Sequence, residues 1–98
     1  ERGPSMLALS GAARLVADRA PSVERQVAFR LDVSMSHARL RQDVAALAAL
    51  LDAERLSPEQ VVNSVTARES MLALLRRDRK AATPGLYPLA HRMGLIAA

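Results

Sequence analysis

The chain has 98 residues, enough for one domain with a modest core and too few for two. Half of the residues are hydrophobic and 24% are charged, a balance typical of globular chains that excludes a disordered one. The net charge of +4 is compatible with an acidic protein partner or with nucleic acid, but it falls well short of a tail built to bind DNA.

The composition also excludes several kinds of site. Without cysteine there are no disulfides, no thiolate chemistry and no cysteine-based zinc site. No apolar run approaches the roughly 20 residues that span a bilayer, and no segment has the pattern of a signal peptide. The sequence lacks a glycine-rich phosphate loop, a His-Glu-x-x-His motif and a serine elbow. We therefore expect a cytoplasmic protein that is not an enzyme and holds no cofactor or metal.

The abundant residues are strong helix formers, whereas strand-favouring residues are sparse and scattered. This predicts an all-α fold: one helical domain over residues 1–98, with about five helices around one long central helix.

The first predicted helix begins at Ser5, a good N-cap, and runs to the Ala20-Pro21-Ser22 segment. Its apolar stripe follows helical spacing, with Leu7 and Leu15 beside it, and consists of Met6, Leu9, Ala13, Val16 and Ala20. Ser22 then caps a second helix, in which we expect the buried side chains to be Val23, Val27, Phe29 and Leu31.

The long central helix is predicted from Met35 to Ala53, after a break at Ser34-Met35-Ser36. Apolar or neutral residues recur there at alternating steps of four and three, namely Val33, His37, Leu40, Val44, Leu47 and Leu51. Alanines flank this stripe and permit close helix–helix approach. Such a stripe must pack against the rest of the chain or against a partner.

Two capping boxes follow, Ser57-Pro58-Glu59-Gln60 and Thr66-Ala67-Arg68-Glu69. They predict a short helix, a break near residues 63–66, and a further helix to about Ala82. Thr83-Pro84-Gly85 then separates a last helix near Pro88–Met93, which Gly94 should close in a left-handed conformation while Leu95 packs back on it.

One internal echo is present. Residues 5–9 recur as residues 70–74, and residues 27–33 resemble residues 89–95. A weak duplication of 5–33 as 70–95 would explain both matches, and chance similarity between Ala/Leu-rich helices is the competing explanation.

Residues 27–34 also fit the first part of a helix-turn-helix motif, except that Asp32 stands where glycine is usual. The recognition helix would run from Met35 to Val44 and present four polar side chains to a major groove, Ser36, His37, Arg39 and Gln42. The alternative is a plain amphipathic hairpin, in which His37 is a packed or interfacial histidine.

The favoured hypothesis is an α-helical module for protein interaction or self-association. Its interface would be the apolar stripe Leu40, Val44, Leu47 and Leu51. Its basic contacts would be Arg39, Arg41, Arg76, Arg77, Arg79 and Lys80, which suit carboxylates or phosphates. The alternative hypothesis is a small basic DNA-binding protein of helix-turn-helix type, in which the same arginines contact phosphates. No membrane association is expected.

Overall fold

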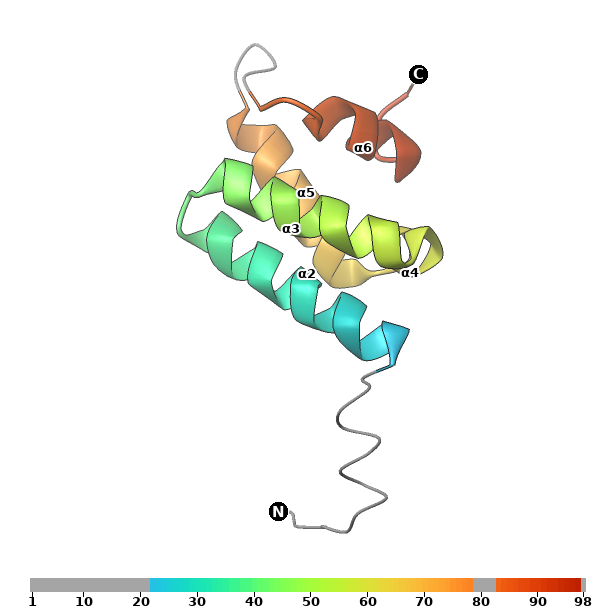
Figure 1. The fold of residues 1–98 in the computed structure, drawn as a ribbon. Coiled ribbons are helices and arrows are strands. Elements are labelled where there is room, and N and C mark those ends of the chain that lie inside the picture. The colour runs from blue at the N-terminus through green and yellow to red at the C-terminus, as the bar shows by residue number, and fades with distance from the viewer. Residues whose placement is uncertain (1–21, 79–82, 98) are drawn as a thin grey trace, which may run out of the picture.

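The computed structural model describes residues 22–78 and 83–97. These residues form five helices and no strand: α2 (Val23–Arg39), α3 (Asp43–Leu56), α4 (Pro58–Val62), α5 (Val65–Arg77) and α6 (Leu86–Arg92). Figure 1 shows α2 and α3 side by side, with α5 behind them and α6 on the opposite side of α3 from α2. The all-α prediction is confirmed, while the helix predicted for residues 5–20 lies outside the described residues.

Serine side chains cap three of these helices. The Ser22 hydroxyl accepts a hydrogen bond from the Arg25 amide at 3.2 Å, and Ser57 caps α4 with Pro58 in the first turn. Both caps were predicted from sequence, as was the break after α4. The cap of α5 is Ser64 instead of Thr66, because the Ser64 hydroxyl accepts from an amide in the first turn at 3.1 Å.

The predicted continuous helix from Met35 to Ala53 is wrong. α2 runs through the expected break at residues 34–36 and ends at Arg39, and α3 begins at Asp43. The turn between them is a Schellman motif: the Arg41 amide donates to the Ala38 carbonyl at 3.1 Å, and the Gln42 amide donates to the His37 carbonyl at 2.9 Å. Arg41 has a φ of 59°, a left-handed position that usually holds glycine.

α2 continues through residues 34–36 because Ser34 is used in packing. Its side chain is fully buried, and its hydroxyl donates to the Ala46 carbonyl of α3 at 2.9 Å. The hydrogen bond offsets the cost of removing the hydroxyl from water, and the small side chain lets the two helices approach closely. Ser34 therefore joins the two helices instead of ending one.

The core is aliphatic and lies between the α2–α3 pair, α5 and α6. The largest fully buried apolar side chains are Leu50, Val61, Met71, Leu74, Leu86 and Leu89. Full burial of each stabilises the fold by roughly 1.5–3 kcal/mol. Val27 and Leu31 of α2 are buried as predicted, but Val23 and Phe29 are exposed. A helix rotates by 100° per residue, so Phe29 lies on the side of α2 opposite to Val27 and Leu31.

α6 ends as its sequence predicts. Gly94 has a φ of 75°, its amide donates to the His91 carbonyl at 3.0 Å, and the Leu95 amide donates to the Ala90 carbonyl at 2.9 Å. This is a second Schellman motif, and Leu95 packs against the core after it. The helix begins at Leu86, two residues before the predicted start.

Candidate functional site

A shallow groove between α2 and α3 is the most distinctive surface of the described residues. We call it the α2–α3 groove, and its lining consists of Phe29, Arg30, Val33, Ala45, Ala48, Ala49 and Asp52. Phe29 lies on the side of α2 opposite to its buried stripe, whereas Arg30 borders that stripe and is half-buried. The lining therefore runs from the exposed face of α2 at Phe29 to the edge of the core at Ala49.

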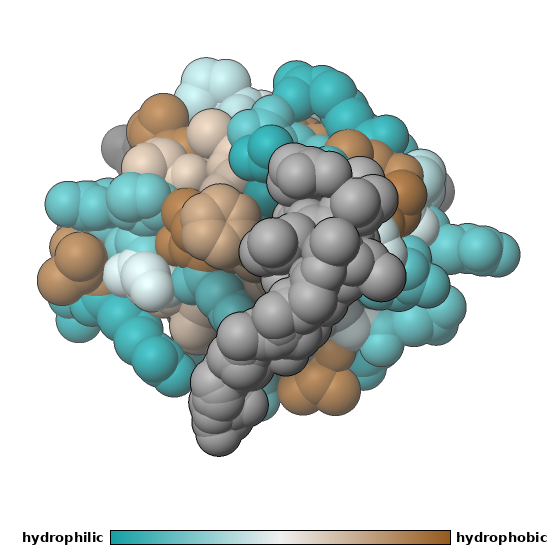
Figure 2. Space-filling model, turned by 60° about the horizontal axis from the view of Figure 1, so that its bottom comes forward, coloured by the Kyte–Doolittle hydropathy of each residue, from teal (hydrophilic) through white to brown (hydrophobic). Residues whose placement is uncertain are grey.

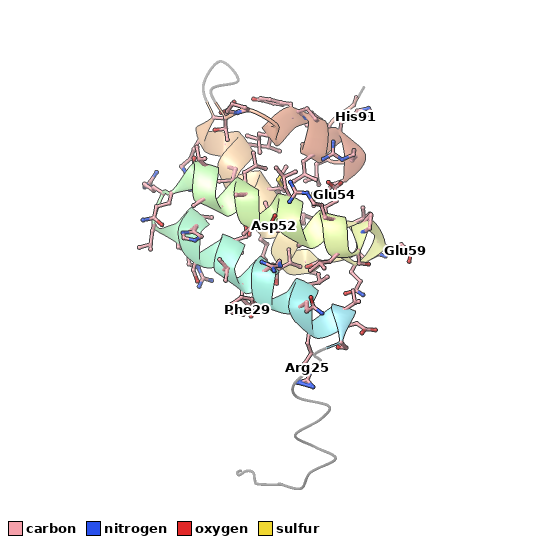
Figure 3. All side chains as sticks on the ribbon, in the orientation of Figure 1. Arg25, Phe29, Asp52, Glu54, Glu59 and His91 are labelled. Carbon is pink, nitrogen blue, oxygen red and sulfur yellow. The ribbon has the colours of Figure 1, made fainter. Side chains whose placement is uncertain are left out.

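Phe29 is the prominent apolar side chain of this groove, with 65% of its surface exposed. Figure 3 shows Phe29 and Arg25 extending from α2 on the side away from α6 and His91. Figure 2 views the molecule from the α2 side and shows several separate patches of hydrophobic residues among hydrophilic ones. This exposure leaves a large aromatic ring available for contact with another molecule.

The rest of the lining is small and weakly charged. Alanines of α3 supply much of it, so that a helix laid there could approach the backbone closely. A second hollow shares Phe29 and Arg30 and continues along α2 to Arg25 and Gln26. Of the groove's two charged residues, Asp52 is already paired with Arg55 in the next turn of α3. The positive charge of Arg30 therefore dominates the groove.

The predicted apolar interface does not form one surface. Leu47 is only 3% exposed and Leu51 is partly buried against the core, whereas Leu40 and Val44 are 67% and 70% exposed. Only Leu40 is separated from the stripe by the break, because it is the C-cap of α2, whereas Val44, Leu47 and Leu51 share one face of α3. That face turns from exposed at Val44 to buried at Leu47. Leu47 is a core residue, and Leu40 and Val44 flank the turn.

Arg77 has a structural position within the fold. Its guanidinium donates to the Asp43 carboxylate of α3 at 2.5 Å and to the Ala38 carbonyl of α2 at 2.8 Å. Arg77 and Asp43 are both about three-quarters buried. Arg77 thus joins the end of α5 to the end of α2 and the start of α3, and it satisfies a carbonyl of the last turn of α2.

The other predicted basic contacts that the structure describes lie near the α2–α3 turn. Arg39 and Arg41 are exposed at the α2–α3 turn, and Arg76 is exposed near the end of α5. Arg79 and Lys80 lie outside the described residues. Arg77, the neighbour of Arg76, bonds Ala38 and Asp43, so these arginines lie at the same end of the fold as the exposed Leu40 and Val44.

The helix-turn-helix prediction for residues 27–44 also fails locally. The required turn near residues 31–34 is absent, because α2 is helical throughout residues 23–39. His37 is partly exposed, and its Nδ1 lies 2.7 Å from the Gln42 Oε1 across the Schellman turn. The two segments of the internal echo differ in structure. Residues 27–33 lie within α2, whereas residues 89–95 span the end of α6.

α6 is tied to α3 by a bidentate ion pair. The Arg92 guanidinium donates to both oxygens of Glu54, at 2.7 and 2.8 Å. The hydrogen bond to Glu54 raises the pKa of Arg92 above its ordinary value. Glu54 is mostly buried, so this pair belongs to the packing of α6 and leaves no open acidic site there.

Sequence reasoning missed the α2–α3 groove because it assigned Phe29 to the core. The spacing held the necessary signal, since Val27 and Leu31 are four residues apart and Phe29 lies midway between them, on the opposite face. Arg30 and Asp52 carried no distinguishing pattern, because the hairpin that brings them to one groove was not predicted.

Within residues 22–78 and 83–97, no helix is long and apolar enough to cross a membrane. The same residues contain no group of three or more histidine or carboxylate side chains placed to hold a metal ion. Comparisons with protein-family models, with curated proteins and with solved structures found no match.

Proposed function

We propose that this chain is a non-enzymatic helical interaction module, and that its α2–α3 groove binds an amphipathic helix of a partner protein. The observation that supports this is the exposure of Phe29 beside an alanine-lined groove between α2 and α3. Exposed aromatic rings next to small side chains suit the packing of an added helix, whose anchors recur at every third or fourth residue.

The charge of the groove supports one class of partner helix. Arg30 lines the groove, and Asp52 is paired with Arg55. A helix with glutamates beside its apolar stripe would place carboxylates near the Arg30 guanidinium group. The favoured partner is therefore an acidic amphipathic helix.

The test uses a synthetic helical peptide as long as α2, with a leucine stripe flanked by glutamates. We expect saturable binding by calorimetry, with affinity at least about tenfold lower for Ala48→Glu, because the new carboxylate would fill the groove beneath the apolar stripe. Val65→Glu is the matched control, since Val65 is equally apolar, 70% exposed, and outside the groove lining. A second peptide with lysines in place of glutamates should bind more weakly.

Equal affinity of the two variants, or preference for the lysine peptide, would contradict the proposal. Leu47→Asp, a variant of the predicted stripe, is unsuitable because it would place a charge in the core and should unfold the domain. Light scattering over a concentration series checks whether a second copy occupies the groove instead.

DNA binding is the second candidate, favoured only by the exposed Arg39, Arg41 and Arg76. Adding a random duplex at low salt to the same scattering series tests it. A mass increase that disappears with added salt and with loss of these arginines would favour DNA over the acidic helix.

A further inference from the structure

The apolar wall of the α2–α3 groove continues along α2 to the turn that joins α2 to α3. Phe29 and Val33 line the groove, and Leu40, the C-cap of α2, follows Val33 by seven residues. Steps of four and seven residues keep these three side chains on one face of a helix. Leu40 is 67% exposed and Phe29 is 65% exposed, so this apolar face is open at both of its ends. The face extends over about 16 Å, which is roughly three helical turns.

Positive charge increases along this face toward the turn. Arg39 and Arg41 flank Leu40 in sequence, and both are exposed. Arg76 is also exposed, and it belongs to the end of α5 that is bonded to the last turn of α2. Three guanidinium groups thus lie at the turn, whereas Arg30 is the one arginine in the lining of the groove.

The carboxylates that are nearest to these arginines in sequence are already in use. Asp43 is paired with Arg77, and the pair is about three-quarters buried. Asp78 accepts a hydrogen bond from the Thr83 amide through Oδ1 at 3.0 Å, and its Oδ2 is buried. Neither residue therefore offers a free carboxylate to the exposed arginines at the turn.

We propose that the helix bound in the α2–α3 groove also covers Leu40, and that its carboxylates are concentrated at the end that reaches the α2–α3 turn. The inference rests on the proposed function for the groove, and it adds the length and the charge pattern of the partner helix. Such a helix has one apolar anchor over Phe29 and another over Leu40, about three turns apart. Carboxylates beyond the second anchor accept hydrogen bonds from Arg39 and Arg41.

The continuity of the apolar face favours a helix over a duplex at this end of the fold. Phosphates would use the arginines, but they would leave Leu40 and Phe29 in water. An amphipathic helix with an acidic end uses both features at once, because it removes the two apolar side chains from water and supplies the opposite charge.

The experiment uses the full chain and two peptides as long as α2 that share one leucine stripe and the same number of glutamates. The end-acidic peptide carries its glutamates in one terminal turn, and the mid-acidic peptide carries them at its centre. We expect the end-acidic peptide to bind more tightly in calorimetry. Arg39→Glu should lower its affinity at least about tenfold, and that of the mid-acidic peptide less than about threefold. Arg41 is left in place because of its left-handed backbone.

Matched controls exist for charge and for apolar contact. Arg68→Glu makes the same change of charge at an exposed position near the other end of α5, and it should leave both affinities unchanged. Leu40→Ser should weaken both peptides several-fold, whereas Val65→Ser, at a site that is 70% exposed, should weaken neither. Circular dichroism establishes that each variant remains folded.

Equal affinity of the two peptides for the unaltered chain, or equal effects of Arg39→Glu and Arg68→Glu, would overturn the inference and leave the proposed function standing. A random duplex that displaces the end-acidic peptide, and that binds Leu40→Ser unchanged, would also overturn it by assigning the turn to phosphates. The proposed function fails in a different way, when neither peptide binds the unaltered chain, and the inference then fails with it.

Discussion

Replacement of Arg41 by glycine should stabilise this domain, even though it removes a large side chain. Arg41 has a φ of 59° at the Schellman turn between α2 and α3. A left-handed conformation costs a non-glycine residue about 1–2 kcal/mol, and glycine removes this cost. Glycine also destabilises the folded state by roughly 0.5–1 kcal/mol, because it loses more conformational freedom on folding. The free energy of unfolding should therefore rise by about 0.5–1 kcal/mol.

The assay is thermal and urea unfolding followed by circular dichroism. The expected gain corresponds to a rise in Tm of about 2–8 °C for a domain of this size. Arg41→Ala is the control, because it removes the same side chain but keeps the left-handed strain, and it should change stability by less than about 0.5 kcal/mol. If Arg41→Gly is no more stable than Arg41→Ala, the backbone argument is refuted.

Gly94 offers the reverse test within the same molecule. It occupies the equivalent position at the end of α6 with a φ of 75°, and a Cβ built there meets no atom within 4 Å. Gly94→Ala thus introduces backbone strain without a steric clash, and it should lower the free energy of unfolding by about 1 kcal/mol.

Two further substitutions measure the contacts that hold α2 to its neighbours. Ser34→Ala removes the buried bond to the Ala46 carbonyl and should cost about 1 kcal/mol in urea unfolding; an unchanged midpoint would contradict that role. Arg77→Ala should cost about 1.5–3 kcal/mol, because it leaves Asp43 without its partner, whereas exposed Arg76→Ala should cost less than about 0.5 kcal/mol. A double-mutant cycle of Arg77→Ala with Asp43→Ala should give a coupling energy clearly above zero, and additive effects would count against the ion pair.

Local chemistry made several features of this fold predictable. The caps at Ser22 and Ser57 and the closing turn at Gly94 each depend on residues that are neighbours in sequence. Each needs a particular side chain, such as a hydroxyl or the absence of a Cβ, and therefore leaves a recognisable pattern.

The end of α2 left no such pattern. Arg41 is neither glycine nor proline, and the apolar spacing from Val33 to Leu51 continues through the turn as though one helix spanned it. The turn is also held by a tertiary contact, since Arg77 of α5 bonds the Ala38 carbonyl in the last turn of α2 and the Asp43 carboxylate. These contacts join residues that are 34 and 39 positions apart, and local periodicity carries no sign of them. The sequence therefore could not show that Leu47 lies in the core and not at an interface.

The same failure hid the candidate site. The α2–α3 groove exists because α3 turns back along α2, which places the alanines of one helix beside Phe29 of the other. The alanine-rich flank was visible in the sequence and was correctly associated with close helix approach. Which of these alanines would line an exposed groove depended on the α2–α3 turn, which was not predicted.

The bonds of Ser34 and Arg77 also differ in when they can form. Ser34 and Ala46 are 12 residues apart, and a three-residue connection brings their helices together, so little chain entropy opposes their contact. Arg77 and Ala38 are 39 residues apart, and their bond requires α5 to be in position already. Loss of the first bond should slow folding, and loss of the second should mainly speed unfolding. Arg77 thus governs how long the folded state persists more than how quickly it is reached.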